Sequence, residues 1–167
     1  MSAAVPAVRV GQGVDVHPLV DGRPLVLGGV VVPFERGLAG HSDADVLTHA
    51  VCDAVLSAAG LGDLGQHFPA SDPRWAGADS LTFCRQVVAL AGEAGWAIGN
   101  VAATVVCDRP RLGAHLPAMT VALAAALGVD PGQVQVTAKA SEGLGFTGRG
   151  DGIAAIAVCL LAGRALA

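Results

Sequence analysis

Two residues near the start of the chain have the chemistry and the spacing of metal ligands. Asp15 and His17 lie two positions apart in residues 11–19, a segment typical of a β-strand. Alternate side chains of a strand share one face, so a carboxylate oxygen and an imidazole nitrogen would lie side by side. With His49 as the third ligand, such a set would hold zinc with one open coordination position, which is typical of a catalytic rather than a structural site.

His49 lies in residues 42–59, which the sequence predicts to be a helix. Ser42 is the candidate N-cap, and Asp45 follows three residues later, as in a capping box. Asp45, His49 and Asp53 recur at four-residue spacing on the polar side of this helix. Either aspartate could orient the imidazole of His49, or be no more than a solvated helix residue. His41 and Ser42 precede the helix, where free N–H groups favour an anion.

The remaining elements are predicted from the spacing of the apolar residues. Residues 8–17 and 25–32 are expected to be strands joined as a hairpin. The later segments are a loop at 33–40, an irregular connection at 60–78, helices at 79–94 and 114–127, and strands at 98–107, 134–140 and 153–161. This order indicates a single α+β domain over residues 1–167, with a mixed sheet, helices packed on one face and a flexible tail at residues 1–6.

The amino-acid composition limits the kinds of molecule that we expect the chain to bind. Apolar residues make up 53% of the 167 residues and charged residues only 14%, so we expect further copies of the chain to cover much of its surface. A net charge of -4 argues against nucleic acid as a partner, because no basic face would neutralise phosphates.

The cysteines and the N-terminal region indicate the compartment. The cysteines show no paired CxxC spacing, so we expect buried free thiols at Cys52, Cys84, Cys107 and Cys159. Residues 1–8 lack the basic start and apolar run of a signal peptide, and no apolar run is long enough to span a bilayer. These features predict a soluble cytoplasmic protein with no membrane partner.

Four separated motifs follow one another along the chain. They are Asp-Val-His at 15–17, His-Ser-Asp-Ala-Asp at 41–45 with His49 after it, Phe-Pro at 68–69, and Gly-Leu-Gly-Phe-Thr-Gly-Arg-Gly at 143–150. Together they closely resemble the 2-C-methyl-D-erythritol 2,4-cyclodiphosphate synthase family over residues 10–161. The resemblance implies a homotrimer whose sheets enclose a central apolar channel, with active sites between adjacent subunits.

The resemblance also implies a reaction. The 2-phosphate of 4-diphosphocytidyl-2-C-methyl-D-erythritol 2-phosphate attacks the β-phosphate of the same molecule, releases CMP and closes 2-C-methyl-D-erythritol 2,4-cyclodiphosphate. Such an enzyme is a phosphorus–oxygen lyase of the non-mevalonate isoprenoid pathway. It needs no nucleophile of its own, and positioning alone can lower the barrier by roughly 7 to 11 kcal/mol.

Site residues follow from the same resemblance. Asp15, His17 and His49 would hold Zn²⁺, and Glu142 would bind Mg²⁺ or Mn²⁺ on the substrate diphosphate. The implied catalytic positions are His41, Lys139, Ala140 and Glu142, with His41 assigned to transition-state stabilisation. The implied contacts to the cytidine diphosphate-linked substrate are Asp15, His17, His41, Ser42, Asp63, Leu64, Gly65, Phe68, Asp72, Cys107, Arg109, Arg111, Gly113, Lys139, Ser141, Glu142, Phe146 and Arg149. Residues 63–72 would cover the erythritol moiety, and residues 107–113 would bind cytosine.

Two segments depart from the family pattern. Ala140 stands where a threonine hydroxyl normally helps to position the phosphates, and its loss would cost on the order of 1.5 to 3 kcal/mol. Lys139, the only lysine, or Ser141 could compensate. The run Asp-Arg-Pro-Arg at 108–111 replaces a less charged one, and Asp151 replaces a common glutamate.

Other interpretations stay open at this stage. An Asp-x-His pair alone is weak evidence for a metal, and His67 and His115 read as ordinary surface or loop histidines. The glycines of residues 143–152 could serve only turns with positive φ. A zinc-dependent phosphohydrolase is the alternative enzyme, and a trimer that binds isoprenoid diphosphates without turnover is the non-enzymatic alternative.

Overall fold

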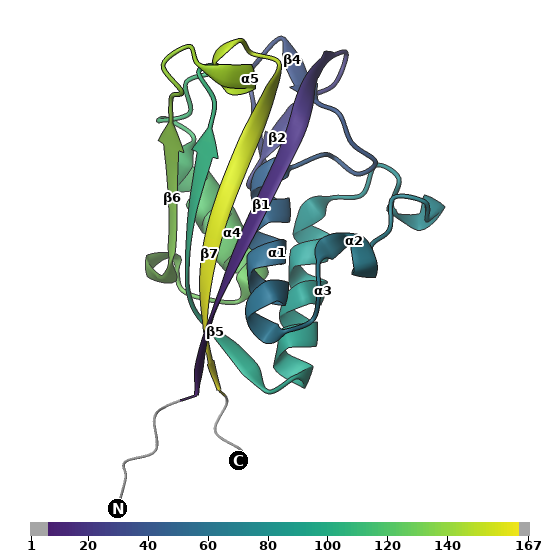
Figure 1. Cartoon of the computed structure of the whole chain (residues 1–167), viewed down its shortest axis with the longest axis vertical. Helices are drawn as coiled ribbons and strands as arrows, with labels where there is room; N and C mark the ends of the chain where they lie inside the picture. The colour runs from purple at the N-terminus through teal and green to yellow at the C-terminus, as the bar shows by residue number, and fades with distance from the viewer. Residues whose placement is uncertain (1–6, 164–167) are drawn as a thin grey trace, which may run out of the picture.

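The structure is a computed structural model that describes residues 7–163, so the tail predicted at residues 1–6 lies outside it. The strands are β1 (Val8–Asp21), β2 (Leu25–Leu27), β3 (Val30–Val32), β4 (Arg36–Leu38), β5 (Trp96–Val106), β6 (Val134–Lys139) and β7 (Gly152–Gly163). The helices are α1 (Val46–Ala59), α2 (Leu64–His67), α3 (Ser80–Glu93), α4 (Leu116–Leu127) and α5 (Gly145–Gly148), with 3-10 turns at Pro73–Trp75 and Pro131–Gln133. Figure 1 shows a long twisted sheet with helices gathered against it, which confirms the α+β class.

The main sheet has the strand order β4-β1-β7-β5-β6, and β2 and β3 form a separate pair. Strand β1 runs antiparallel to β4 and to β7, and β7 runs antiparallel to β5. Strands β5 and β6 are parallel. The main sheet is therefore mixed, as predicted. Its centre is the long pairing of β1 with β7, which brings the two ends of the described chain together.

Two glycines of β1 allow α1 to lie directly on the sheet. A Cβ atom at Gly11 would lie 2.1 Å from a carbonyl oxygen of α1, and one at Gly13 would lie 2.0 Å from another. No other residue permits so close an approach. Because strand side chains alternate, Asp15 and His17 face the same helix-covered side as these glycines. The contact that packs α1 also directs the candidate ligands toward it.

The hydrophobic core lies between the sheet and helices α1, α3 and α4. Helix α1 is buried over most of its length, since β1 and β7 lie on one side of it and α3 packs beside it. All four cysteines are buried free thiols, as predicted. Burial raises the pKa of Cys107 to about 11 and that of Cys159 to about 12. None of the helices in residues 7–163 has the length and apolarity needed to cross a membrane.

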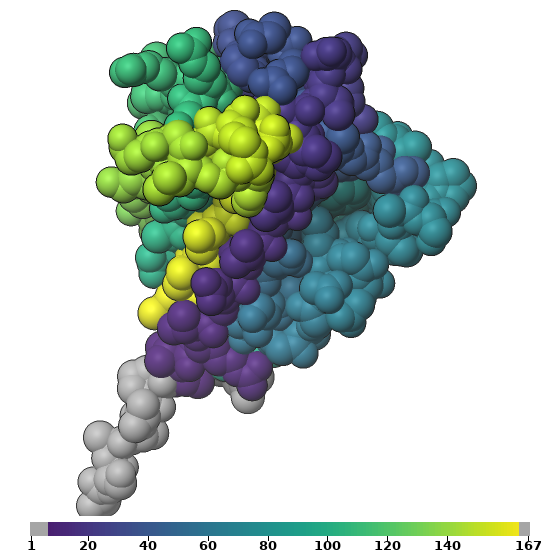
Figure 2. Space-filling model, turned by 45° about the horizontal axis from the view of Figure 1, so that its top comes forward, coloured from purple at the N-terminus to yellow at the C-terminus, as the bar shows by residue number. Residues whose placement is uncertain are grey.

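The opposite face of the sheet is apolar and exposed. Its large apolar side chains are between 40% and 68% exposed, and they are Val8, Val10, Val14 and Val16 of β1 with Ile156 and Val158 of β7. Figure 2 shows the two strands, purple and yellow, side by side on the surface of the molecule. We call these six residues the outer sheet face. No helix of the described residues covers it.

The hairpin predicted between residues 8–17 and 25–32 is wrong. Residues 25–32 contain two short strands, β2 and β3, which pair with each other around Gly28 and Gly29. Both glycines have positive φ, 58° and 74°, so the apolar run folds back on itself instead of extending beside β1. The predicted loop at 33–40 contains β4, which takes the place beside β1.

Two further predictions about local structure need correction. Asp45, rather than Ser42, is the N-cap of α1, and its side chain accepts from the N–H of Thr48. The helix therefore begins at Val46, five residues after His41, and the carboxylate of the N-cap Asp45 already accepts from its first turn. The connection predicted to be irregular at 60–78 contains α2 and a 3-10 turn. In the glycine-rich segment, Gly143, Gly145 and Gly150 have positive φ, as the turn reading expected, and α5 lies among them.

Candidate active site

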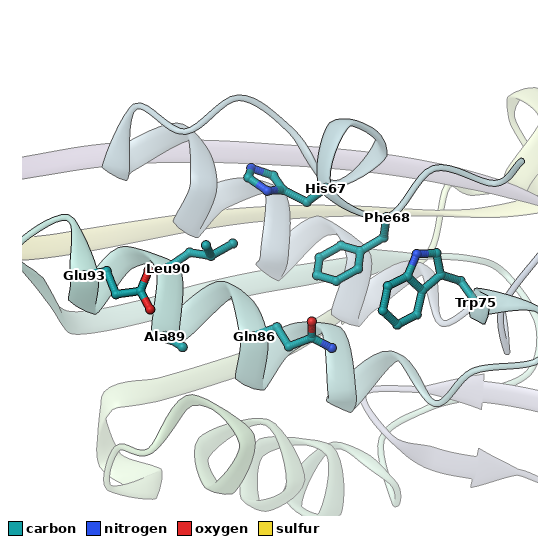
Figure 3. Close-up of a pocket in the computed structure, with 7 residues that line it drawn as sticks. All are labelled: His67, Phe68, Trp75, Gln86, Ala89, Leu90 and Glu93. Atoms are coloured by element: carbon teal, nitrogen blue, oxygen red, sulfur yellow. The ribbon is translucent and has the colours of Figure 1, made fainter. Parts of the chain in front are cut away.

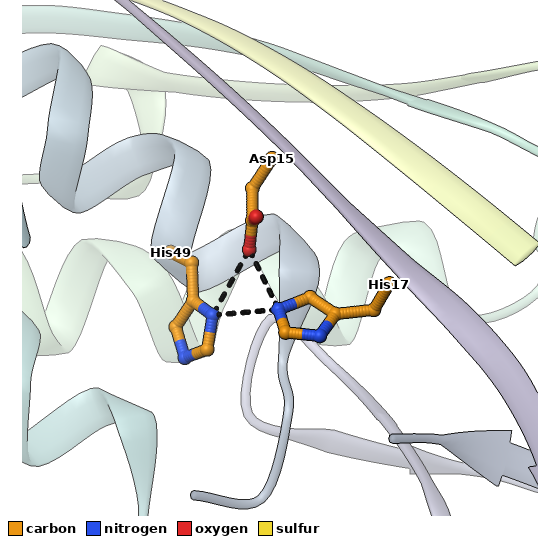
Figure 4. A group of neighbouring side chains, drawn as sticks. All are labelled: Asp15, His17 and His49. Carbon is orange, nitrogen blue, oxygen red and sulfur yellow. Dashed lines mark hydrogen bonds and ion pairs between the residues drawn. The ribbon is translucent and has the colours of Figure 1, made fainter. Parts of the chain in front are cut away.

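Asp15, His17 and His49 form one cluster between β1 and the first turn of α1 (Figure 4). The Asp15 Oδ2 atom lies 2.8 Å from His17 Nε2 and 3.0 Å from His49 Nδ1, and the two nitrogens are 3.2 Å apart. Each residue thus directs one ligand atom at a common point. The structure brings together all three ligands that the sequence predicted.

The imidazole of His17 is oriented by a backbone carbonyl. Its Nδ1 lies 2.6 Å from the oxygen of Ala39, which can only accept a hydrogen bond. Nδ1 therefore carries a proton, and Nε2 faces the cluster, where it donates to Asp15 when protonated and offers its lone pair to a metal when not. Ala39 follows β4, so the neighbouring edge strand of β1 sets the orientation of this ligand.

His49 is oriented by hydroxyl groups rather than by the aspartates of its own helix. Its Nε2 lies 2.9 Å from Ser80 Oγ and 3.2 Å from Ser42 Oγ. The prediction that Asp45 or Asp53 orients this ring is wrong, because both carboxylates accept from backbone groups elsewhere. The prediction that they could be solvated is also wrong for Asp45, which is fully buried.

The electrostatics of the cluster suit a cation. Burial acts to raise the pKa of Asp15, but hydrogen bonds and charges from His17 and His49 outweigh it and hold this pKa well below its usual range. Burial likewise acts to lower the pKa of His17, and the hydrogen bond to Asp15 outweighs it and raises the pKa. The centre of the cluster therefore favours positive charge, which a proton or a divalent metal can supply. Two imidazoles and a carboxylate are a donor set that fits zinc.

A cavity of about 140 Å³ adjoins the cluster. Its lining is His17, His41, Ser42, His49, Leu64, Phe68, Ala70, Trp75 and Phe83. The rings of Phe68 and Phe83 stack at 4.7 Å, and Trp75 meets both edge-on at 5.2 Å and 5.6 Å. The cavity thus has polar groups on the side of the cluster and an aromatic wall opposite. Among the predicted substrate contacts, His17, His41, Ser42, Leu64 and Phe68 lie here.

The aromatic wall also borders a second hollow on its outer side. This hollow of about 360 Å³ is lined by His67, Phe68, Trp75, Gln86, Ala89, Leu90 and Glu93, which Figure 3 shows along α3 and the end of α2. His67 donates from Nε2 to the carbonyl oxygen of Leu61, 2.8 Å away. It lies outside the metal cluster, as predicted, but at the end of α2 rather than in a loop.

Three of the predicted contacts in the connection 60–78 do not line the cavity next to the cluster. The carboxylate of Asp63 caps α2 by accepting from Gln66, and Gly65 lies within that helix. Asp72 forms an ion pair of 2.6 Å with Arg74, and its carbonyl oxygen lies 3.0 Å from His41 Nε2. Asp72 therefore reaches the site only through its backbone contact with His41.

A second group of predicted residues lies at the ends of β5 and β6. A cavity of about 660 Å³ is lined there by Cys107, Asp108, Pro110, Arg111, Leu112, Gly113, Ala114, Leu116, Ala138, Lys139, Ala140 and Glu142. Another, of about 440 Å³, has Arg109 and Arg149 in its lining together with Arg36. These residues belong to elements other than those that carry the metal cluster, so one chain presents the predicted site in two parts.

Asp108 organises the segment that carries Glu142. Its carboxylate accepts from Ser141 N at 2.6 Å, from Ser141 Oγ at 2.8 Å and from Gly143 N at 2.7 Å. Glu142 itself has a φ of 55°, which is unusual for a residue other than glycine. The Ser141 hydroxyl is thus committed to Asp108, and it accepts from Thr147. It is less available than predicted to replace the missing hydroxyl of residue 140.

The sequence alone did not identify three residues around the cluster. Ser80 and Asp43 lie behind His49, joined by a short hydrogen bond. Arg23 donates to the carbonyl of Gly40 at 3.0 Å and to that of Ser42 at 2.7 Å, so it fixes the loop that carries His41. Only contacts across the fold reveal these roles, although Ser80 was recognisable as a helix start.

Residues 8–162 match the model of the YgbB family. The chain belongs to the YgbB family. A relative in Ralstonia nicotianae, 2-C-methyl-D-erythritol 2,4-cyclodiphosphate synthase, is 56% identical over 154 residues, which cover 92% of this chain and 92% of that protein. The predicted resemblance is therefore confirmed.

Two solved structures share the fold of this chain. The bifunctional IspDF from Campylobacter jejuni superposes with a TM-score of 0.92 at 36% identity, over 95% of this chain and 43% of that chain. A 2C-methyl-D-erythritol-2,4-cyclodiphosphate synthase in a CDP-bound form superposes with a TM-score of 0.84 at 40% identity, over 92% of this chain and 99% of that chain. In the first case this chain therefore corresponds to less than half of a larger protein.

Proposed function

We propose that the chain cyclises 4-diphosphocytidyl-2-C-methyl-D-erythritol 2-phosphate to 2-C-methyl-D-erythritol 2,4-cyclodiphosphate with release of CMP. The observation that carries this proposal is the Asp15, His17 and His49 cluster beside a partly aromatic cavity, in a chain of the YgbB family. The relative in Ralstonia nicotianae bears the name of this activity. The enzyme would act in the non-mevalonate isoprenoid pathway, and its cytoplasmic location stays a prediction.

The residues of the chain would bind and orient the substrate. Asp15, His17 and His49 would hold Zn²⁺, and Glu142 would bind Mg²⁺ or Mn²⁺ with the substrate diphosphate. Divalent cations supply Lewis-acid stabilisation to phosphate oxygens. Because the attacking phosphate belongs to the substrate, the protein needs no nucleophile. Its contribution is to fold the substrate so that the two phosphates meet.

The cavity beside the cluster fits the erythritol phosphate end of the substrate. His41 and the hydroxyl of Ser42 line it and would donate to phosphate oxygens, while Phe68 faces the carbon skeleton. Arg23 supports this role, since it holds the loop through two carbonyl groups and adds positive charge near His17.

The larger cavity at the ends of β5 and β6 fits the cytidine end. Cys107, Arg111 and Gly113 line it together with Lys139 and Glu142. A CDP-bound form of a similar structure supports a nucleotide diphosphate as the ligand class. Arg109 and Arg149 lie in the neighbouring cavity, where their charges would act on anionic groups at longer range.

The two parts of the site would meet in a homotrimer. The cavity beside the metal cluster and the nucleotide cavity share no lining residue within one chain, so we infer that a second copy completes the site. The exposed outer sheet face supports this assembly, because contiguous apolar surface of this kind marks an interface. Three sheets that meet through this face would enclose the predicted apolar channel.

Product identification tests the reaction. The protein is incubated with the diphosphocytidyl substrate, Zn²⁺ and Mg²⁺, and phosphorus NMR is used to identify the products. We expect CMP together with the cyclic diphosphate. CMP with a linear product would instead indicate the zinc-dependent phosphohydrolase, and the absence of CMP would indicate a binding protein without turnover.

Removal of one ligand tests the metal site separately. We expect His49→Ala to lose bound zinc and activity and to stay folded, because α1 is held by apolar packing. His115→Ala is the matched control, since His115 lies outside the cluster and precedes α4. Zinc content by elemental analysis and helix content by circular dichroism are measured on both. Full zinc occupancy in His49→Ala would show that the site is misassigned.

A further inference from the structure

A hydrogen-bonded chain of two residues ends on the metal ligand His49. The Nε2 atom of His49 lies 2.9 Å from Ser80 Oγ, and Ser80 Oγ in turn makes a short hydrogen bond to Asp43 Oδ1. The other carboxylate oxygen of Asp43 accepts from the backbone N–H of Ser80 at 3.0 Å. Asp43 and Ser80 come from segments 37 residues apart, so the fold alone brings this chain together.

The direction of each hydrogen bond along this chain follows from the carboxylate of Asp43 at its end. An ionised carboxylate only accepts, so the hydroxyl of Ser80 must donate to Asp43. The Ser80 oxygen is then free to accept, and it receives the Nε2–H of His49. With its proton on Nε2, His49 presents the lone pair of Nδ1 to the cluster, 3.0 Å from Asp15 Oδ2. This is the tautomer that metal binding through Nδ1 requires.

The chain is buried and held at several points. Ser80 is fully buried, and it is the first residue of α3. Asp43 also accepts from the N–H of Asp45, the N-cap of α1. One carboxylate therefore ties the start of α3 to the start of α1, and Ser80 cannot rotate away from His49 without losing its bond to Asp43.

Ser42 is the other hydroxyl near His49 Nε2, but its position suits a different task. Its oxygen is farther away, at 3.2 Å, and it also accepts from the N–H of Ala44 at 3.2 Å. Since Ser80 accepts from the Nε2–H of His49 at the shorter distance, Ser42 is not needed to orient the ring, and its hydroxyl can donate elsewhere. Ser42 also lines the cavity next to the cluster, where an anionic ligand would be the acceptor.

We propose that Asp43 and Ser80 are positioning residues that set the tautomer and ring orientation of His49 and thereby strengthen metal binding at the Asp15, His17 and His49 cluster. The inference rests on the metal site of the proposed function, but not on the reaction. Loss of such an outer partner typically weakens metal binding about 10- to 100-fold.

Metal affinity of the Ser80→Ala variant tests the proposal. Metal-free protein competes for Zn²⁺ with a chromophoric chelator at constant pH, and thermal unfolding of the metal-free protein is followed in parallel. We expect the zinc dissociation constant to rise about 10- to 100-fold. Ser80→Thr keeps the hydroxyl and should recover most of the affinity. Ser57→Ala is the matched control, because Ser57 is an exposed serine of α1.

A purely structural role of Ser80 would give a different result. It would lower the unfolding temperature of the metal-free variant and leave its zinc affinity at the level of the unsubstituted protein, and that outcome would overturn the proposal. If Ser80→Ala does not fold, Asp43→Asn takes its place in the same assay, with the same expected loss. Nitrogen chemical shifts of the His49 ring provide a second readout, since we expect the Nε2–H tautomer to lose its dominance when Ser80 is removed.

Failure of the proposed reaction would be visible separately. If the unsubstituted protein binds zinc but does not cyclise the diphosphocytidyl substrate, the reaction is wrong and the positioning role stands. If the unsubstituted protein binds no zinc in the competition assay, both fail.

Discussion

At the scale of single residues, both histidines of the candidate metal cluster are oriented by a partner outside it. A backbone carbonyl after β4 orients His17, and Ser80 orients His49. Asp45, which the spacing along α1 had suggested for this role, instead joins the start of the helix to the turn between β2 and β3. Polar residues near the cluster thus orient a ligand in one place and stabilise the fold in another. Only the pattern of hydrogen-bond donors and acceptors distinguishes the two roles.

Asp45→Asn should destabilise the protein, because all four groups that bond to the Asp45 carboxylate are donors. They are the N–H groups of Gly28, Gly29 and Thr48 and the hydroxyl of Thr48. An asparagine would present an NH₂ group to donors in a fully buried position. We expect a loss of about 1 to 3 kcal/mol in the free energy of unfolding, measured by urea denaturation. Asp79→Asn is the control, because Asp79 is an exposed N-cap and asparagine caps as well as aspartate. Equal stability of the two variants would contradict this reading.

Ala140→Thr tests the main departure from the family pattern. Ala140 is exposed and lines the cavity at the ends of β5 and β6 with Lys139 and Glu142, so a threonine there has room for its hydroxyl. A new hydrogen bond to phosphate is worth about 1.5 kcal/mol or more, which allows an increase in kcat of up to about tenfold. The rate is measured by CMP release. An unchanged rate would mean that Lys139 already compensates, whereas a marked loss would show that this segment is built around alanine.

At the scale of elements, the sequence predicted the helices and the main strands well and the pairing of strands poorly. Predicted helices at 79–94 and 114–127 agree with α3 and α4, and the strand at 153–161 agrees with β7, because apolar spacing reports burial directly. Pairing depends on turns. The positive φ of Gly28 and Gly29 splits a continuous apolar run into two strands, and only this pair of glycines signalled it. The prediction of the site has the same limit. The alternation of side chains along a strand places Asp15 beside His17, but no local pattern in the sequence places Ser80 behind His49.

Gly13→Ala should disrupt the contact between β1 and α1. A Cβ at this position would lie 2.0 Å from a helix carbonyl oxygen, so the strand or the helix must move. We expect a loss of about 1 to 3 kcal/mol or more in the free energy of unfolding. Gly132→Ala is the control, since a Cβ there meets nothing within 4 Å. Gly13 lies two residues before the candidate ligand Asp15, on the same face of β1. A shift of the strand would move Asp15, so zinc affinity should fall in the same variant. Full stability would mean that α1 can shift without cost.

At the scale of the whole molecule, one side of the sheet forms the core and the other remains apolar but uncovered in a single chain. The low charge and high apolar content of the sequence predicted an uncovered apolar surface. Which residues form that surface followed only from the register of β1 with β7. The cysteine thiols lie on the buried side of the sheet. In our proposal, the exposed side joins the subunits.

The native protein should resist thiol alkylation. All four cysteines are buried, and burial raises the pKa of Cys107 to about 11 and that of Cys159 to about 12, so little thiolate forms near pH 8. Mass spectrometry after iodoacetamide treatment at this pH should show unmodified protein, and treatment in denaturant should modify every cysteine. Rapid modification of the folded protein would contradict the buried positions.

Val158→Lys tests whether the outer sheet face joins subunits. Val158 is 42% exposed on β7, opposite Gln12 of β1 and diagonal to Val10 and Val14, so a lysine there would place charge within the proposed interface. Light scattering after gel filtration should give a mass near the 16.5 kDa of one chain instead of three times that value. Val121→Lys is the control, because Val121 is 57% exposed on α4, away from this face, and should leave the proposed trimer intact.

The monomeric variant should keep its zinc, since one chain supplies Asp15, His17 and His49. It should lose turnover, since the proposed nucleotide cavity of a second copy is then missing. A trimeric Val158→Lys variant would place the interface elsewhere, and a monomer with full turnover would mean that one chain holds the complete site.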